Sequence, residues 1–181
     1  MEARKIFAVA ASIFILSACG TPKPPPPQAA PPRFNLNDDL DVASAILIQR
    51  DEYKKSTHYI GPNAADRPSD KMYLHAWKRD HGKAVYQIYV MIGYTGEWRL
   101  FNWAYDPYGV TLDTTLLTRN LQDCKTPGCA HDERIGLDVT ASYLNANRQK
   151  GIRFWVSGKA GEDIPFFIPG GYVRAFLSAT Q

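Results

Sequence analysis

The chain has 181 residues, of which 45% are hydrophobic and 12% aromatic, and its 21 basic and 18 acidic side chains give a net charge of +3. This composition excludes a largely disordered chain, because unfolded segments have few aromatic residues and a high net charge. The near balance of charge, with no run of like charges longer than two residues, argues against nucleic acid or an anionic lipid surface as a partner.

The N-terminus has the layout of a secretory signal, in which Arg4 and Lys5 precede an apolar run over residues 6–16. That run is too short for a membrane-spanning helix, which takes about 20 apolar residues. It ends in Leu16-Ser17-Ala18-Cys19, which resembles the lipobox of bacterial lipoproteins. The resemblance implies that residues 1–18 are a signal peptide cleaved before Cys19. It also implies a diacylglycerol on the Cys19 sulfur and a fatty acid on the new amine.

The resemblance also implies a location. By similarity to lipoprotein sorting, Gly20 in the place of an aspartate favours the outer membrane, with the domain facing the periplasm. Three acyl chains would give stable attachment, because a single chain binds a membrane only reversibly. The alternatives are an uncleaved anchor and a plain secretory signal followed by a chance cysteine.

A proline-rich linker follows Cys19, since residues 20–32 hold seven of the 13 prolines. Proline fixes φ and lacks a backbone donor, so this segment cannot join the interior of a helix or sheet. We expect a stiff spacer of roughly 40 Å, at about 3.1 Å per residue. A proline-rich ligand for a recognition domain is the alternative. Residues 19–32 are therefore assigned to the lipidated cysteine and linker, and 33–181 to a single globular β-rich domain.

The first part of the domain predicts strands joined by turns. Residues 44–50 are assigned to a strand, with a helix starting at Asn37 as the alternative, because Asp38, Asp39 and Asp41 would suit its first turn. Further strands are expected at 72–78, 84–94, 98–105 and 110–117. Asp80 to Gly82 indicates a hairpin, and Asp106-Pro107-Tyr108-Gly109 a tight turn. These four strands predict an antiparallel meander.

The second part of the domain predicts two helices. A strand at 135–139 leads to a helix over 141–150, which Thr140 can cap and Gly151 can end. A strand at 152–157 precedes a helix over 172–177, whose apolar residues lie at i, i+1, i+4 and i+5. The predicted fold class is α+β and mostly antiparallel β, a sandwich-like meander with two late helices packed on a sheet.

Cys124 and Cys129 enclose a Pro-Gly turn and predict a structural disulfide, as an oxidising envelope compartment allows. Redox catalysis is an alternative, but it usually uses Cys-x-x-Cys. Metal binding with His131 is another, but a fourth ligand is not evident. No motif in the sequence predicts a cofactor or a metal site.

Aromatic residues are concentrated between Tyr86 and Tyr108, and they supply the candidate binding residues. On a regular strand Phe101, Trp103 and Tyr105 would share one face with Arg99. One face of that strand would be core, and the other a binding face for a protein or a sugar. The alternative is a strand buried on both sides. The candidates are Arg99, Phe101, Trp103, Tyr105 and Tyr108.

His131-Asp132-Glu133-Arg134 is the densest group of titratable side chains, and we expect it to be a solvated strand entrance. The alternative is a glycan hydrolase that uses Glu133 or Asp138. It requires two carboxylates in one cleft, roughly 5 to 10 Å apart. Since no catalytic spacing accompanies the group, the sequence favours a non-enzymatic envelope module. Such a module would be anchored to the membrane through acylated Cys19 and would contact an envelope protein. A glycan-binding module is the other alternative.

Overall fold

The computed structural model describes residues 34–125, 128–159 and 161–181. The expected signal peptide, Cys19 and linker lie outside these residues. In the described part of the chain nine strands form one sheet with the order β1-β2-β3-β4-β7-β6-β5-β8-β9, and all neighbouring strands are antiparallel. The strands are β1 (Leu47–Asp51), β2 (Ser56–Ile60), β3 (Lys71–Arg79), β4 (Ala84–Thr95), β5 (Trp103–Tyr105), β6 (Thr111–Lys125), β7 (Gly128–Val139), β8 (Ile152–Ser157) and β9 (Asp163–Ile168).

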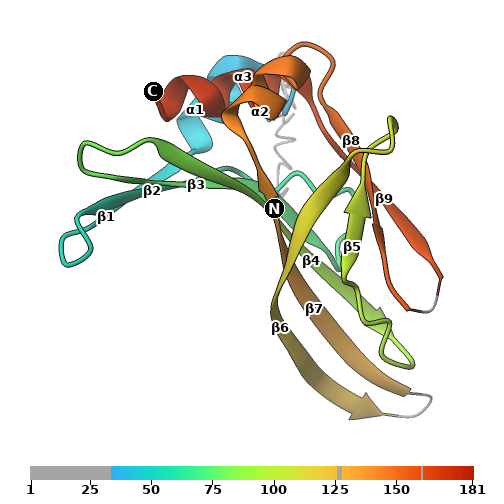
Figure 1. Cartoon of the computed structure of the whole chain (residues 1–181). Coiled ribbons are helices and arrows are strands. Elements are labelled where there is room, and N and C mark those ends of the chain that lie inside the picture. The colour runs from blue at the N-terminus through green and yellow to red at the C-terminus, as the bar shows by residue number, and fades with distance from the viewer. Residues whose placement is uncertain (1–33, 126–127, 160) are drawn as a thin grey trace, which may run out of the picture. The chain divides into compact units, whose positions relative to one another are not determined.

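Three helices accompany the sheet: α1 (Asp39–Ala45), α2 (Ala141–Asn147) and α3 (Gly170–Ala179). They gather at one end of the curled sheet, which forms a half-barrel around the core (Figure 1). The fold is therefore α+β and mostly antiparallel β, as predicted. It is a single curled sheet, however, and the sandwich expected from the sequence is wrong.

The two-residue alternation of the strands decides which face of the sheet is buried. On β3 the even-numbered Met72, Leu74 and Ala76 are buried, and on β4 so are Ile88 and Val90. The odd-numbered residues of both strands point to the opposite face and are mostly half-buried. Buried apolar side chains of strands β3 to β9 and of α3 therefore belong to one core, and Tyr59 of β2 packs against it.

Helix α3 closes the core with the face that the sequence predicts. Tyr172, Val173 and Phe176 are fully buried. The Tyr172 hydroxyl donates to the Pro62 carbonyl at 2.7 Å and accepts from the Leu74 amide at 3.3 Å. It thus satisfies two backbone groups that lie 110 and 98 residues before it in the chain. The backbone of α3 also approaches another segment closely, because a Cβ on Gly171 would lie 2.0 Å from the Asn37 carbonyl oxygen.

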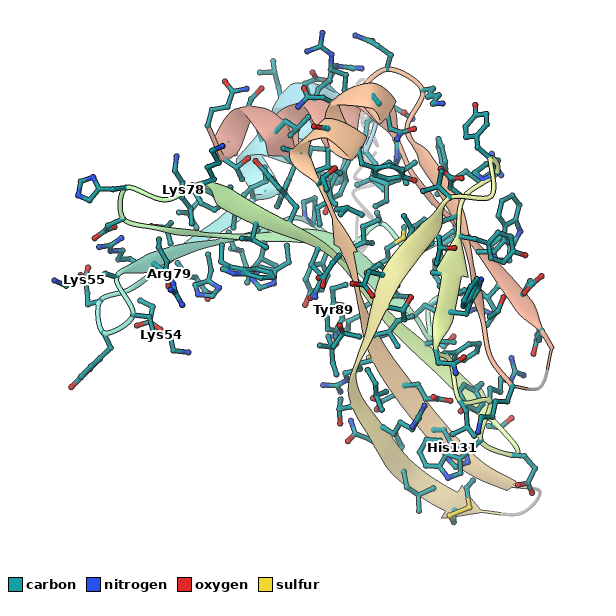
Figure 2. The ribbon with its side chains drawn as sticks, viewed as in Figure 1. Lys54, Lys55, Lys78, Arg79, Tyr89 and His131 are labelled. Atoms are coloured by element: carbon teal, nitrogen blue, oxygen red, sulfur yellow. A yellow bond between two sulfur atoms is a disulfide. The ribbon has the colours of Figure 1, made fainter. Side chains whose placement is uncertain are left out.

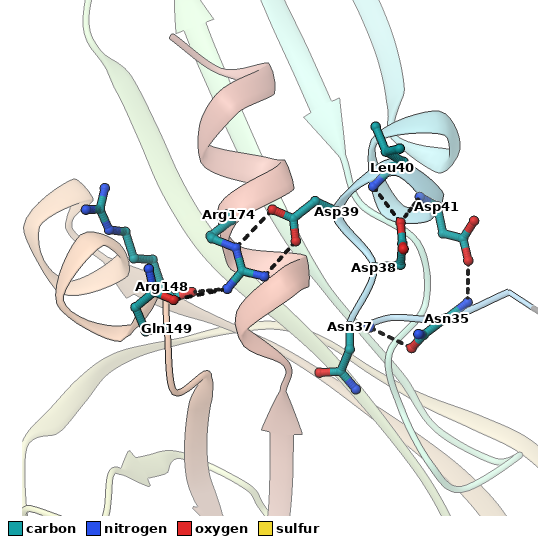
Figure 3. A network of polar contacts seen from close by, with 9 residues as sticks. All are labelled: Asn35, Asn37, Asp38, Asp39, Leu40, Asp41, Arg148, Gln149 and Arg174. Carbon is teal, nitrogen blue, oxygen red and sulfur yellow. Dashed lines mark hydrogen bonds and ion pairs between the residues drawn. The ribbon is translucent and has the colours of Figure 1, made fainter.

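One arginine links the three helices (Figure 3). Arg174 of α3 donates through Nε and Nη2 to both carboxylate oxygens of Asp39 on α1, at 2.9 and 2.7 Å. Its Nη1 donates to the carbonyl of Arg148, just after α2, at 3.1 Å. Such a two-pronged pair holds its geometry better than a single contact.

The first segment of the domain combines the two alternatives that its sequence allows. Asp38 caps α1, since its carboxylate accepts from the amides of Leu40 and Asp41 at 2.9 and 3.1 Å. The helix ends at Ala45, and β1 begins at Leu47. A strand over 44–50 is thus wrong for its first residues and right for its last. The described part of the domain has three helices where two were expected.

The β6–β7 hairpin is the main departure from the predicted meander. Strand β6 continues well past Leu117, where the predicted strand ended, and β7 begins well before Ile135, where the next one was expected. In the sheet β7 lies between β4 and β6. Register shifts between Leu116 and Thr118 and between Leu121 and Asp123 bend β6. Cys124 and Cys129 are directly opposite at the end of the hairpin and are joined by a disulfide, with sulfurs 2.11 Å apart. The predicted pairing is confirmed.

Candidate binding face

An outward row of aromatic and basic side chains covers the β5–β8–β9 part of the sheet. We call it the aromatic face and define it by Trp103, Tyr105, Arg153, Trp155 and Phe167. Tyr105 lies opposite Trp155, and Arg153 opposite Phe167. The same strands turn Ala104, Phe154, Val156, Ile164 and Phe166 into the core. The inner side of these strands is therefore fully occupied by packing, and the aromatic face is the side open to a ligand.

The rings of the aromatic face are held by contacts within it. The rings of Tyr105 and Trp155 lie 5.6 Å apart and nearly parallel, at 17°. The Arg153 guanidinium lies 5.2 Å from the centre of the Phe167 ring. The Tyr105 hydroxyl donates to Asp163 at 2.7 Å, and this hydrogen bond raises the pKa of Tyr105. Trp103 is 52% exposed. Aromatic and arginine side chains at a surface are typical of binding sites.

A pocket of about 250 Å³ adjoins the aromatic face through Arg153 and Phe167. The Lys150 ammonium lies over the Tyr108 ring at 4.3 Å and donates to its hydroxyl at 3.0 Å. The other lining residues are Asp106, Pro107, Tyr143, Asn147 and Gly151. The pocket thus places two cationic side chains beside aromatic rings.

Asp106 fixes the turn that carries Tyr108. Its buried carboxylate accepts from the amides of Tyr108 and Val110, each at 2.9 Å, and from the Tyr143 hydroxyl at 3.3 Å. Burial, and then the charge of Asp106, raises the pKa of Tyr143. The predicted tight turn at 106–109 is therefore held by the side chain of its first residue.

Glu133 organises the loop that contains Arg99 and Phe101. Its side chain is completely buried. One carboxylate oxygen accepts from the Leu100 amide at 2.9 Å and from the Tyr94 hydroxyl. The other accepts from the Phe101 amide at 3.1 Å and from Arg119 Nε at 2.8 Å. Burial, together with the bond to Glu133, raises the pKa of Tyr94 to about 12. The expectation of a solvated group around Glu133 is wrong.

His131 and Asp132 are buried as well. His131 Nε2 lies 2.8 Å from the Gly96 carbonyl oxygen, so this nitrogen carries the proton. The Trp98 ring lies over the imidazole, with centroids 4.1 Å apart. Asp132, on the other face of β7, accepts from Asn120 and Arg134 at 3.0 and 2.9 Å. The group is structural, and its inward members hold the loop after β4 against β7.

The structure brings together four of the five predicted binding residues. Trp103 and Tyr105 belong to the aromatic face, and Tyr108 lines the adjoining pocket. Arg99 lies next to the same strands, because its carbonyl accepts from the Lys159 amide at 2.9 Å and its side chain pairs with Glu162 at 2.5 Å.

Phe101 is not a binding residue, since it is 0% exposed and belongs to the core. The regular alternation that would place it beside Trp103 breaks at Leu100, whose φ is +55°. Sequence reasoning also missed Arg153, Trp155 and Phe167. One signal was available for Trp155, because in the predicted strand at 152–157 it alternates with Phe154 and Val156 and so faces the opposite side of the sheet from them.

The carboxylates required by the glycan hydrolase alternative do not share a cleft. Glu133 and Asp138 are five residues apart on β7, so they point to opposite faces of the strand. Glu133 is buried with both oxygens bonded, while Asp138 is exposed and accepts from Gln87 Nε2 at 2.8 Å. This pair cannot act as the acid and base of a glycosidase.

Comparison of the chain with protein-family models, with curated proteins and with solved structures finds no match in any of the three. Of the helices that the structure describes, none combines the length and the apolar character that crossing a bilayer takes.

Proposed function

We propose that this chain is a lipid-anchored module of the bacterial cell envelope that binds a protein partner through its aromatic face and catalyses no reaction. The observation that carries the proposal is the outward-facing row of aromatic rings and Arg153 on strands whose inner side is filled by the core. Trp103 and Arg153 are exposed, and the other rings of the row are half-buried. Trp, Tyr and Arg are the residues that contribute most to binding energy at protein interfaces.

The anchor and linker suit this role. Acylation of Cys19 would hold the chain at the outer membrane, and the proline-rich residues 20–32 would set the domain roughly 40 Å from the lipid surface. A partner standing in the periplasm, away from the bilayer, is within that reach. The anchor is tested separately by mass spectrometry of the native protein, which is expected to find Cys19 acylated. An unmodified residue 19 would contradict the anchor.

The partner is tested by site-specific photocrosslinking in intact cells. A photoreactive amino acid at Trp103 is expected to give a discrete crosslinked species that can be identified by mass spectrometry. The matched control is the same amino acid at Tyr53, which is fully exposed in the turn between β1 and β2, away from the aromatic face. Equal crosslinking from both positions, or none from Trp103, contradicts the proposal.

Glycan binding is the second candidate, and the pocket beside the aromatic face favours it. Near-parallel rings can stack on sugars, and Lys150 and Arg153 can pair with a sugar carboxylate. In this case purified cell-wall fragments bind to the isolated protein, and Trp155→Ala weakens the binding. Crosslinking to a protein without any retention on cell-wall material decides for the protein partner.

A further inference from the structure

A second pocket lies on the outward face of β2, β3 and β4, which the sheet order separates from the aromatic face. Its volume is about 370 Å³, within the range of small-ligand sites. It is lined by Lys54, Ser56, His58, His75, Trp77, Arg79 and Gln87. Figure 2 shows Lys54, Arg79 and Tyr89 on this side of the sheet, while Lys78 points from the other side.

The lining is cationic. Lys54 and Arg79 are basic, and neither makes an ion pair with any residue that the structure describes. Two acids border this pocket: Asp51 of β1 accepts from the Lys54 amide, and Asp138 of β7 accepts from the side chain of Gln87. Asp80, at the hairpin end, is held by Arg50 through two bonds of 2.6 and 2.8 Å. None of the residues that line the pocket is an acid, so Lys54 and Arg79 give the lining its charge.

Two histidines in direct contact form the floor of this pocket. His58 Nδ1 lies 3.2 Å from His75 Nε2, and the rings are stacked with centroids 5.5 Å apart. A hydrogen bond between two imidazoles needs a proton on one nitrogen and a lone pair on the other. Burial lowers the pKa of His75, and the neighbouring His58 lowers it further. His75 thus resists protonation when no anion is bound.

The pair also approaches a serine, since Ser56 Oγ lies 3.4 Å from His58 Nε2. The order serine, histidine, histidine resembles a nucleophilic triad, but its third member is wrong for catalysis. In a working triad a carboxylate stabilises the imidazolium that forms when the serine loses its proton. Here His75 would face that cation with a positive charge or a neutral ring. An anion supplied by a ligand provides the missing compensation, so the arrangement suits binding.

We propose that this pocket binds the phosphate group of a small organic phosphate, and that binding is coupled to protonation of His75, which lies against His58. Lys54 and Arg79 would contact the oxyanion, and the organic part would lie against Trp77, whose ring contacts His75 at 5.3 Å between centroids. The pocket volume of about 370 Å³ is larger than one inorganic anion, so it leaves room for the organic part. This proposal does not depend on the partner proposed for the aromatic face.

The coupling is measured by isothermal titration of the full-length protein in a non-ionic detergent. Sulfate is the first probe, because its charge stays constant where phosphate esters titrate. One proton taken up per anion changes the dissociation constant by up to tenfold per pH unit. We expect sulfate to bind about tenfold more tightly at pH 6.0 than at pH 7.5. Buffers with different ionisation enthalpies report the proton uptake directly.

Variants distinguish sulfate binding in this pocket from non-specific attraction of sulfate to basic side chains at the surface. Arg79→Ala is expected to weaken sulfate binding at least tenfold, while Lys78→Ala, the neighbouring cation on the other face of β3, changes it less than twofold. His75→Gln, which puts a neutral amide in place of the imidazole, is expected to reduce the difference in affinity between pH 6.0 and pH 7.5 to less than threefold. Far-UV circular dichroism of each variant verifies the fold.

Several results would overturn the proposal. An absence of sulfate binding at 20 mM, or equal losses in Arg79→Ala and Lys78→Ala, rules out the pocket as an anion site. An affinity independent of pH rules out the histidine coupling. Phenyl phosphate and short-chain phosphatidic acid then distinguish the source of the phosphate. A soluble ester is favoured if the first binds more tightly, and a lipid headgroup if the second does.

Discussion

The buried carboxylate of Glu133 offers the sharpest test of how the domain is held together. Glu133→Gln keeps the shape of the side chain but removes its charge, and its new NH₂ group must face a donor. Either the Leu100 and Tyr94 donors or the Phe101 and Arg119 donors then lose their acceptor. Hydrogen bonds to a charged group contribute about 1.5–3 kcal/mol each.

Losing such a pair of bonds is expected to lower the free energy of unfolding by about 3–5 kcal/mol, the range for breaking a buried ion pair. That is a large part of the total stability of a domain, about 5–15 kcal/mol. For a domain of this size each kcal/mol corresponds to about 2–4 °C, so the melting temperature should fall by at least 6 °C. Differential scanning calorimetry and urea titration measure both quantities.

The matched control is Glu162→Gln. Glu162 pairs with Arg99 at 2.5 Å, but its side chain is half exposed, so its loss should cost less than about 1 kcal/mol. If Glu133→Gln unfolds within 1 kcal/mol of the unmodified protein, the four contacts do not carry the energy assigned to them. The account of Glu133 as the organiser of the 96–102 loop would then be refuted.

Three further outcomes are expected. Phe101→Ala should lower the free energy of unfolding by about 3–5 kcal/mol, because it leaves a cavity in the core. Trp103→Ala should change the free energy of urea unfolding by less than about 1 kcal/mol but reduce partner capture. The reverse order of the two effects would place Trp103 in the core. Replacing Cys124 and Cys129 together by serine should lower the free energy of unfolding by about 2 kcal/mol in the loop-entropy estimate, and an unchanged urea midpoint would contradict it. Because burial and Glu133 raise the pKa of Tyr94 to about 12 in the folded state, it should stay protonated at pH 11 in ¹³C-tyrosine NMR, and stability should fall above pH 10, where unfolded tyrosines ionise; a shift of its signal centred on pH 10 would contradict this.

Local patterns were sufficient to predict the elements whose environment is simple. The strands over 72–78 and 84–94 alternate between a core and an open face, and the apolar spacing of Tyr172, Val173 and Phe176 survives in α3. The Cys124–Cys129 pair followed from a short loop with a Pro-Gly turn. These signals depend on neighbours within one element, which the sequence displays directly.

The parts that escaped prediction depend on contacts between distant residues. The last half of β6 is polar, and its outward Asn120 is stabilised by Asp132 across the hairpin, a partner that no local pattern indicates. Glu133 looked like a solvated acid because its four donors come from Tyr94, Leu100, Phe101 and Arg119, on three other segments. For the same reason one of the predicted binding residues is wrong. Trp103 and Tyr105 follow the alternation of β5, while Phe101 lies beyond the break at Leu100 and is buried.

The buried side chains of His131 and Glu133 explain how Trp103 and Tyr105 can be held in place although β5 is only three residues long. The chain reaches β5 through the 96–102 loop, and that loop is fastened at both ends: His131 holds Gly96, and Glu133 holds Leu100 and Phe101. Both anchors sit on β7, whose hairpin the disulfide closes. A binding surface that is already ordered loses less conformational entropy when it meets a partner. In the proposed binding role, the buried carboxylate of Glu133 would aid association, because it would hold the loop before Trp103 in place before a partner arrives.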